Sequence, residues 1–278
     1  MKMPNYLLVL AMASTLAMTA ADATAPAPPA AKTSSVVQPV LAQNLAYAPG
    51  RIGLALKVSE SVRLQYPETV MTLAGGTVEV WVYLDEQIPA GKQVFLVSNG
   101  TNNPSWMFWG FETANTNFLA RSRKDAKNFS YYSSIKIPFT TPAKQWTHFA
   151  LVWCNIAPGE SLVQLYVNGK VVIERFDQSL GEATAGPIGI GHNTATISIP
   201  AFSGALDELR ISNCPRPPEE ILADYQAGLS GKALSADDKT LLYAAFEESA
   251  DGLANAMPLT LEKLKEQGEV LLDELVEQ

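Results

Sequence analysis

Between residues 54 and 211 the chain consists of short apolar or alternating runs separated by glycine, proline and asparagine, with no sustained period of 3.6 residues. This pattern indicates an all-β fold. Residues 76–84 alternate between apolar and other side chains, which predicts a strand with one face in a core. Residues 145–153 are apolar at both phases, which predicts a central strand that is covered on both faces.

Asn168-Gly169 is the strongest local signal in the chain, because both residues tolerate the positive φ of a tight hairpin turn between two strand-like runs. A further strand is expected at residues 205–212. The prolines and apolar spacing of residues 215–225 predict one short helix, and residues 240–246 predict a last strand. Many short strands with one brief helix predict a two-sheet antiparallel jelly-roll sandwich.

The first 44 residues predict export followed by a tether. Lys2 precedes a short apolar run and small residues up to Ala25, which is typical of a signal peptide over residues 1–25 that is cleaved near Ala25. A membrane anchor is the competing interpretation, but no window approaches the roughly 20 apolar residues of a spanning helix. Residues 26–44 are rich in proline and alanine, so we expect a disordered tether there. The predicted location is secreted, periplasmic or at the cell surface.

The formal net charge of −8 lies mostly at the end of the chain, because residues 247–278 carry nine acids and two lysines. Residues 26–246 therefore carry only about −1, so the sandwich itself is nearly neutral. The domain expected at residues 45–248 has no basic patch to neutralise phosphates, which disfavours nucleic acid as a partner. Within the acidic segment 249–278, residues 259–276 have the spacing of an amphipathic helix. This helix either folds back on the sandwich or, through residues 259–278, mediates self-association or docking.

Four blocks occur in the order and spacing of a known family: GTVEVWVYLDE (76–86), QWTHFALVW (145–153), LVQLYVNGKVV (162–172) and FSGALDELRISNCPRPPEEILADY (202–225). Through them residues 45–226 resemble the laminin-G-like jelly-roll family, which has the concanavalin A-like lectin/glucanase fold. The resemblance implies the fold, whereas function does not follow from fold. It also implies a structural, hydrogen-bonded role for His148, which lies in the second block.

Catalysis is disfavoured by the placement of the acids. Retaining glycosidases need two carboxylates about 5 Å apart, and those with this fold usually place them at alternate positions of one strand. Asp85-Glu86 and Asp207-Glu208 are adjacent pairs, which project to opposite faces. Neither His148 nor His192 has a partner in a recognisable nucleophile motif. We therefore expect no enzyme.

An aromatic cluster offers binding residues, because Trp106, Trp109 and Tyr131 together with Arg121 suit sugar stacking and hydroxyl recognition. The alternative is that these rings belong to the core.

Asp207 is the candidate metal ligand, because strict alternation would place it on the face of Leu209 and Ile211. A buried carboxylate must be paired, capped or metal-bound. Relatives often hold a structural Ca²⁺ near this strand, so the resemblance implies calcium here, and the alternative is that Asp207 bonds loop amides.

Cys154 and Cys214 form either a disulfide or two inert thiols.

The sequence favours an exported, non-catalytic recognition module that binds a carbohydrate or an extracellular protein. The first alternative is a structural or assembly component of a surface or periplasmic complex that acts through the C-terminal helix. The second alternative is a glycosidase or polysaccharide lyase.

Overall fold

The computed structural model describes residues 37–72, 74–89, 92–99, 107–112, 117–123, 132–138, 141–157, 160–178, 186–192 and 202–247. The predicted signal peptide and the acidic segment 249–278 lie outside these ranges. No helix among the described residues is long and apolar enough to cross a membrane.

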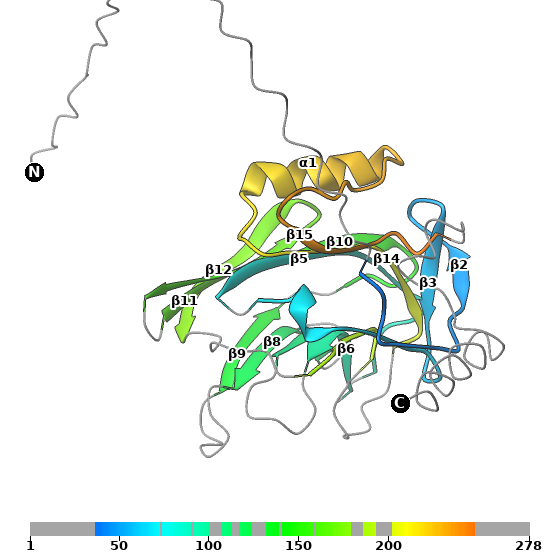
Figure 1. Cartoon of the computed structure of the whole chain (residues 1–278), viewed down its shortest axis with the longest axis horizontal. Coiled ribbons are helices and arrows are strands. Elements are labelled where there is room, and N and C mark those ends of the chain that lie inside the picture. Colours follow the sequence, from blue (N-terminus) through cyan, green and yellow to red (C-terminus); the bar gives the residue numbers. More distant parts are fainter. Residues whose placement is uncertain are drawn as a thin grey trace, which may run out of the picture. The chain divides into compact units, whose positions relative to one another are not determined.

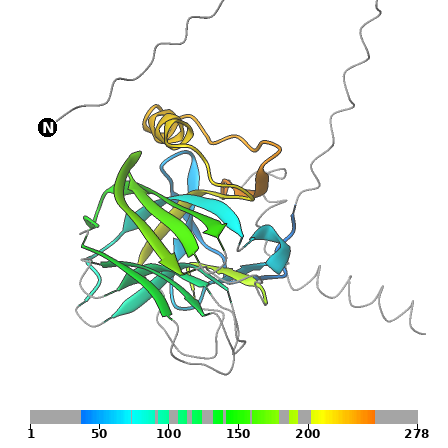
Figure 2. The same ribbon diagram turned by 90° about the vertical axis from the view of Figure 1, so that its left-hand side faces the viewer.

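Two antiparallel sheets pack face to face, and helix α1 (Pro218–Leu229) lies on the outside of one of them (Figures 1 and 2). This arrangement confirms the predicted all-β sandwich with one short helix after the main strands. The smaller sheet contains, in spatial order, β1 (Leu41–Gln43), β4 (Arg63–Tyr66), β13 (Ile188–Ile190), β6 (Gln93–Asn99), β7 (Met107–Glu112), β8 (Asn117–Arg123) and β9 (Tyr132–Pro138).

The larger sheet lies beneath α1 and has β5 and β10 near its centre (Figure 1). Strand β15 (Thr240–Ala244) pairs with β14, and a short 3-10 helix, Glu68–Val70, follows β4. The main path contains β12 (Lys170–Gln178), β11 (Glu160–Val167), β10 (Trp146–Ala157), β5 (Gly75–Leu84), β14 (Gly204–Ser212), β3 (Leu54–Val58) and β2 (Tyr47–Pro49). Strand β1 starts at Leu41, so sheet pairing begins within the segment predicted as a tether.

The core lies between the two sheets, and alternation along the strands supplies it. On β5 the predicted apolar face, Val78, Val80, Val82 and Leu84, is buried in this core. Strand β10 is buried on both faces from Thr147 to Trp153, as predicted, because the smaller sheet covers one face and α1 the other.

The predicted hairpin between β11 and β12 is confirmed. Asn168 and Gly169 have φ of 51° and 73°, and they form the turn at which Val167 pairs with Lys170. The Asn168 side-chain oxygen also accepts the backbone N–H of His148 at 3.0 Å, which ties the turn to β10. Leu222 of α1 packs against Gly169, leaving little room for a larger residue.

Helix α1 begins at a proline and is held near its C-terminus by Arg51. Pro218 stands at its first turn, where the missing N–H has no intrahelical partner to lose. Near its C-terminus, Arg51 donates hydrogen bonds of 3.0 and 2.8 Å to the carbonyls of Gly228 and Leu229, and its guanidinium lies 5.1 Å from the centre of the Trp81 ring. The Arg51 charge thus meets the negative end of the helix dipole.

Candidate functional site

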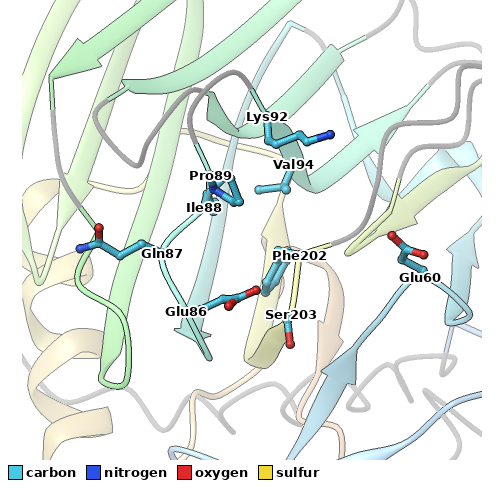
Figure 3. A pocket seen from close by; sticks show the side chains of 9 residues that line it. All are labelled: Glu60, Glu86, Gln87, Ile88, Pro89, Lys92, Val94, Phe202 and Ser203. Atoms are coloured by element: carbon cyan, nitrogen blue, oxygen red, sulfur yellow. The ribbon is translucent and has the colours of Figure 1, made fainter.

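A pocket of about 220 Å³ opens at one rim of the sandwich (Figure 3). It is formed by the turn between β3 and β4, the loop between β5 and β6 and the residues that precede β14. Figure 3 shows the Phe202 ring at its centre with Glu86 and Glu60 on either side. The remaining lining residues are Gln87, Ile88, Pro89, Lys92, Val94 and Ser203.

The floor of this rim pocket is the end of the hydrophobic core. Ile88, Val94 and Phe202 are 3–5% exposed and belong to the main core cluster. Their packing keeps the floor in place, because well-packed core side chains leave little room for movement. The pocket therefore offers a fixed apolar surface at its base.

One wall of the pocket is held by Asp85, which directly follows β5. A single carboxylate oxygen of Asp85 accepts hydrogen bonds from the Lys57 ammonium at 2.5 Å and from the Ser203 hydroxyl at 2.6 Å. The Asp85 backbone N–H also donates to the Ser203 carbonyl at 2.9 Å. The hydrogen bonds from Lys57 and Ser203 hold the pKa of Asp85 below its ordinary value. Asp85 is therefore ionised and neutralised by Lys57 over the physiological range.

The mouth of the pocket is polar and exposed. Glu60, Glu86, Gln87, Lys92 and Ser203 are all exposed. The two carboxylates and the Lys92 ammonium take part in none of the ion pairs formed between described residues. The mouth thus presents both hydrogen-bond donors and acceptors above an apolar floor. This combination suits a ligand that has hydroxyl groups and an apolar face.

The predicted aromatic binding residues do not form this pocket. Trp109 is fully buried in β7 and belongs to the core, which corrects its assignment as a stacking residue. The backbone of Arg121 on β8 pairs with that of Phe108 on β7, and the Arg121 side chain is not among those that the structure describes. Trp106 and Tyr131 lie outside the described residues.

His148 and Glu79 lie under α1 in a buried network of charges. Arg210 donates to both Glu79 on β5 and Asp224 on α1. His148 is fully buried with its Nε2 3.9 Å from Glu79, and burial followed by the nearby Arg210 charge lowers its pKa to about 3. His148 is therefore neutral and enclosed between helix and sheet. Neither of its ring nitrogens has a hydrogen-bond partner among the described residues, which corrects the expectation of a hydrogen-bonded imidazole.

A second part of the network fixes the chain after β14. Arg216 donates to Glu220 at 3.0 Å and to Asp237 at 2.7 Å. The charged side chains on this face therefore join α1 and residues 232–240 to the sheet.

Asp207 lies on the outer face of the larger sheet, and the expected shared face with Leu209 and Ile211 is wrong. Asp207 pairs with Trp81, whereas Arg210 pairs with Glu79, so β14 contains an extra residue. Glu208, with φ of 52°, occupies this bulge. Because a bulge shifts the alternation by one residue, Asp207 and Leu209 fall on opposite faces.

The surroundings of Asp207 do not fit the expected calcium site. Its two carboxylate oxygens accept backbone N–H groups of Ile52 and Glu208 at 2.9 and 2.8 Å. Among the described residues no group of three or more acidic, histidine or cysteine side chains is placed to hold a metal. Burial raises the pKa of Asp207 to about 8, so the carboxyl is stabilised in its neutral form. This arrangement corresponds to the alternative in which Asp207 bonds loop amides.

Cys154 and Cys214 are free, half-buried thiols in this structure. Strand β5 separates them in the sheet, since Cys154 pairs with Gly75 on one side and Ser212, just before Cys214, pairs with Thr77 on the other.

Comparison with known proteins identifies the fold. The family model described as the concanavalin A-like lectin/glucanases superfamily matches residues 58–222. No curated protein matches the chain.

Three solved structures illustrate the likeness. Domain 4 of AbnA, a GH43 extracellular arabinanase from Geobacillus stearothermophilus in complex with arabinotriose, is 21% identical, with a TM-score of 0.51 over 65% of this chain and 80% of that one. The binding domain of Paraclostridial Mosquitocidal Protein 1 is 12% identical, with a TM-score of 0.55. The match covers 69% of this chain and 47% of that one.

A structure of botulinum neurotoxin type C, whose cell entry is described as dependent on interaction with two ganglioside molecules, is 10% identical, with a TM-score of 0.52. The match covers 69% of this chain and 46% of that one. This chain thus spans about half the length of the two toxin structures. At these identities the likeness shows the fold.

Proposed function

This chain belongs to the concanavalin A-like lectin/glucanase superfamily, and from that premise we propose that it is an exported, non-catalytic module that binds a carbohydrate in the rim pocket. The observation that carries the proposal is the combination of a buried apolar floor with exposed donors and acceptors that have no ion-pair partner among the described residues. Sugars need both, because their C–H faces are apolar and their hydroxyls form directed hydrogen bonds.

The size of the pocket sets the scale of the ligand. About 220 Å³ is below the roughly 300–1,000 Å³ of sites that enclose a drug-sized molecule. The pocket therefore suits one sugar unit, such as a chain end or a branch. Two of the similar structures support a saccharide ligand, because one contains arabinotriose and the other concerns gangliosides.

The test is binding of the mature protein to a panel of plant, bacterial and animal polysaccharides, by affinity electrophoresis and calorimetry. Ser203→Ala and Gln87→Ala remove hydrogen-bonding groups at the mouth and should each weaken binding several-fold. Ser230→Ala, at the exposed end of α1, is the matched control and should bind like the wild type. A panel without any bound saccharide, or binding that Ser203→Ala and Gln87→Ala leave unchanged, would overturn the assignment to this pocket.

A glycosidase is a second candidate, favoured by the two carboxylates, Glu60 and Glu86, that line one pocket. Both are exposed, whereas a general acid needs a desolvated setting that keeps it protonated. Release of reducing sugar from any polysaccharide that binds, abolished in Glu60→Gln or Glu86→Gln, would establish the enzyme. Binding without turnover would support the recognition module.

An assembly role is also favoured by one surface. Strand β12 is the last strand of its sheet, and Val171 and Phe176 on it are 53% and 67% exposed. Unpaired strand edges with apolar side chains are sites of protein contact. Light scattering of the wild type and of Phe176→Ser tests this role, since only an assembly through β12 would dissociate in the variant.

Self-association through residues 259–278 stays a prediction, tested by truncation after residue 258.

A further inference from the structure

The charges at the mouth of the rim pocket are unbalanced. Glu60 and Glu86 contribute two carboxylates, and Lys92 contributes the one ammonium among the lining residues. Asp85, which precedes Glu86, does not add to the imbalance, because Lys57 neutralises it at 2.5 Å. The lining therefore carries one net negative charge when these groups are ionised.

These charges lie where a ligand would bind, so their net negative charge would act on it. The pocket is bounded below by Ile88, Val94 and Phe202, which belong to the core. An apolar floor of this kind excludes water from one side of a bound group and so strengthens its interaction with the charges at the mouth. An anionic sugar would lose hydration on entry and meet two carboxylates against one ammonium.

Resting on the proposed carbohydrate-binding function, we propose that the rim pocket selects uncharged and amine-bearing saccharides and rejects uronic acids and sulfated sugars. Glu60 and Glu86 determine this selectivity by repelling anions and by accepting hydrogen bonds from hydroxyl or ammonium groups. Lys92 acts in the opposite sense by partly offsetting the two carboxylates.

The experiment uses ligand pairs that share a backbone and differ in charge. Methyl-esterified polygalacturonate is compared with polygalacturonate, and chitosan oligomers are compared with their N-acetylated counterparts. Binding to the full mature protein is measured by calorimetry at low salt and again at about 1 M salt, where the screening length falls to about 3 Å. The wild type should prefer the ester to the acid by about tenfold and should bind chitosan at least as well as the acetylated oligomer. High salt should reduce both preferences.

Three variants assign the selectivity to the lining charges. Glu60→Gln/Glu86→Gln should lower the preference for the ester toward unity, whereas Lys92→Gln should increase it. Glu219→Gln, an exposed acid on α1, is the matched control and should leave the preference unchanged. All of these positions are exposed, so the substitutions should leave the fold intact.

Two failures are distinguishable. If no saccharide in these pairs or in the wider panel binds, the proposed function fails and the charge selectivity fails with it. If saccharides bind but the ester-to-acid ratio is near unity, favours the acid, or does not respond to Glu60→Gln/Glu86→Gln, the selectivity is overturned while the carbohydrate-binding function stands.

Discussion

The Ser203 hydroxyl donates a hydrogen bond of 2.6 Å to the Asp85 carboxylate. This contact joins the residues before β14 to the loop after β5, although the two positions are far apart in the sequence. Lys57 from β3 binds the same carboxylate oxygen. Three segments of the larger sheet thus meet at Asp85, which sets the position of one pocket wall.

Asp85→Asn should weaken binding of the preferred saccharide by about three- to tenfold, because Ser203 and the adjacent Phe202 lose a charged anchor. Unfolding should become easier by less than about 1 kcal/mol, because the ion pair is about one-third exposed. Calorimetry and urea denaturation measure the two effects. Asp238→Asn, an exposed acid far along the chain, should alter neither, and an unchanged affinity in Asp85→Asn would contradict the role of this wall.

The same carboxylate predicts how the pocket responds to acid. The pKa of Asp85 is lowered in the folded protein by hydrogen bonds from Lys57 and Ser203. A group of this kind stabilises the fold above its ordinary pKa, and the contribution is lost as the pH falls through the lowered value. Its contribution should therefore persist from neutral pH down to about 4 and disappear below. A titration of binding in which Asp85→Asn has the same acid limb as the wild type would exclude this cause.

Asp207 should have the opposite pH dependence. Burial raises its pKa to about 8 in the folded protein, so the stability from its neutral form is fully present below the ordinary value of about 4. It falls as the pH rises and is lost once the pH passes about 8. Asp207→Asn should flatten urea stability between pH 5 and 8 by an amount on the order of a few kcal/mol. An equally steep decline in the variant would show that another group causes it.

The buried network beneath α1 should be sensitive to the loss of one partner. Arg210→Ala leaves Glu79 buried without its main cation, so unfolding should require about 3–5 kcal/mol less. Lys239→Ala, which removes a more exposed cation paired with Glu220, should change stability far less, because solvent screens exposed ion pairs. The double variant Glu79→Gln/Arg210→Met should recover much of the loss, and equal losses for Arg210→Ala and Lys239→Ala would contradict a buried network.

The sandwich could be predicted from the sequence because its signals are local. Alternation in β5, apolar character at both phases of β10 and the Asn168-Gly169 turn each lie within a few residues. Asp207 shows where alternation fails. The bulge at Glu208 shifts the register of β14, and neither the Asp207-Glu208 pair nor the residues around it indicate an inserted residue.

The pocket could not be predicted from the sequence, because its residues come from three segments. Glu60, Glu86 and Ser203 meet only when β3, β5 and β14 lie side by side in the sheet. The sequence instead predicted a binding site at the tryptophans. A large ring in a strand is equally suited to the core, which is where Trp109 lies. Polar residues in separate loops carry no common spacing that a sequence pattern could detect.

The location of the bound saccharide tests the central claim most directly. Chemical-shift changes of backbone amides can be followed by NMR as the tightest-binding oligosaccharide is titrated into the mature protein. We predict that the largest changes fall on Glu60, Glu86, Lys92 and Ser203, with little change along α1. Changes centred on β12 or α1, with the rim pocket unaffected, would contradict the account.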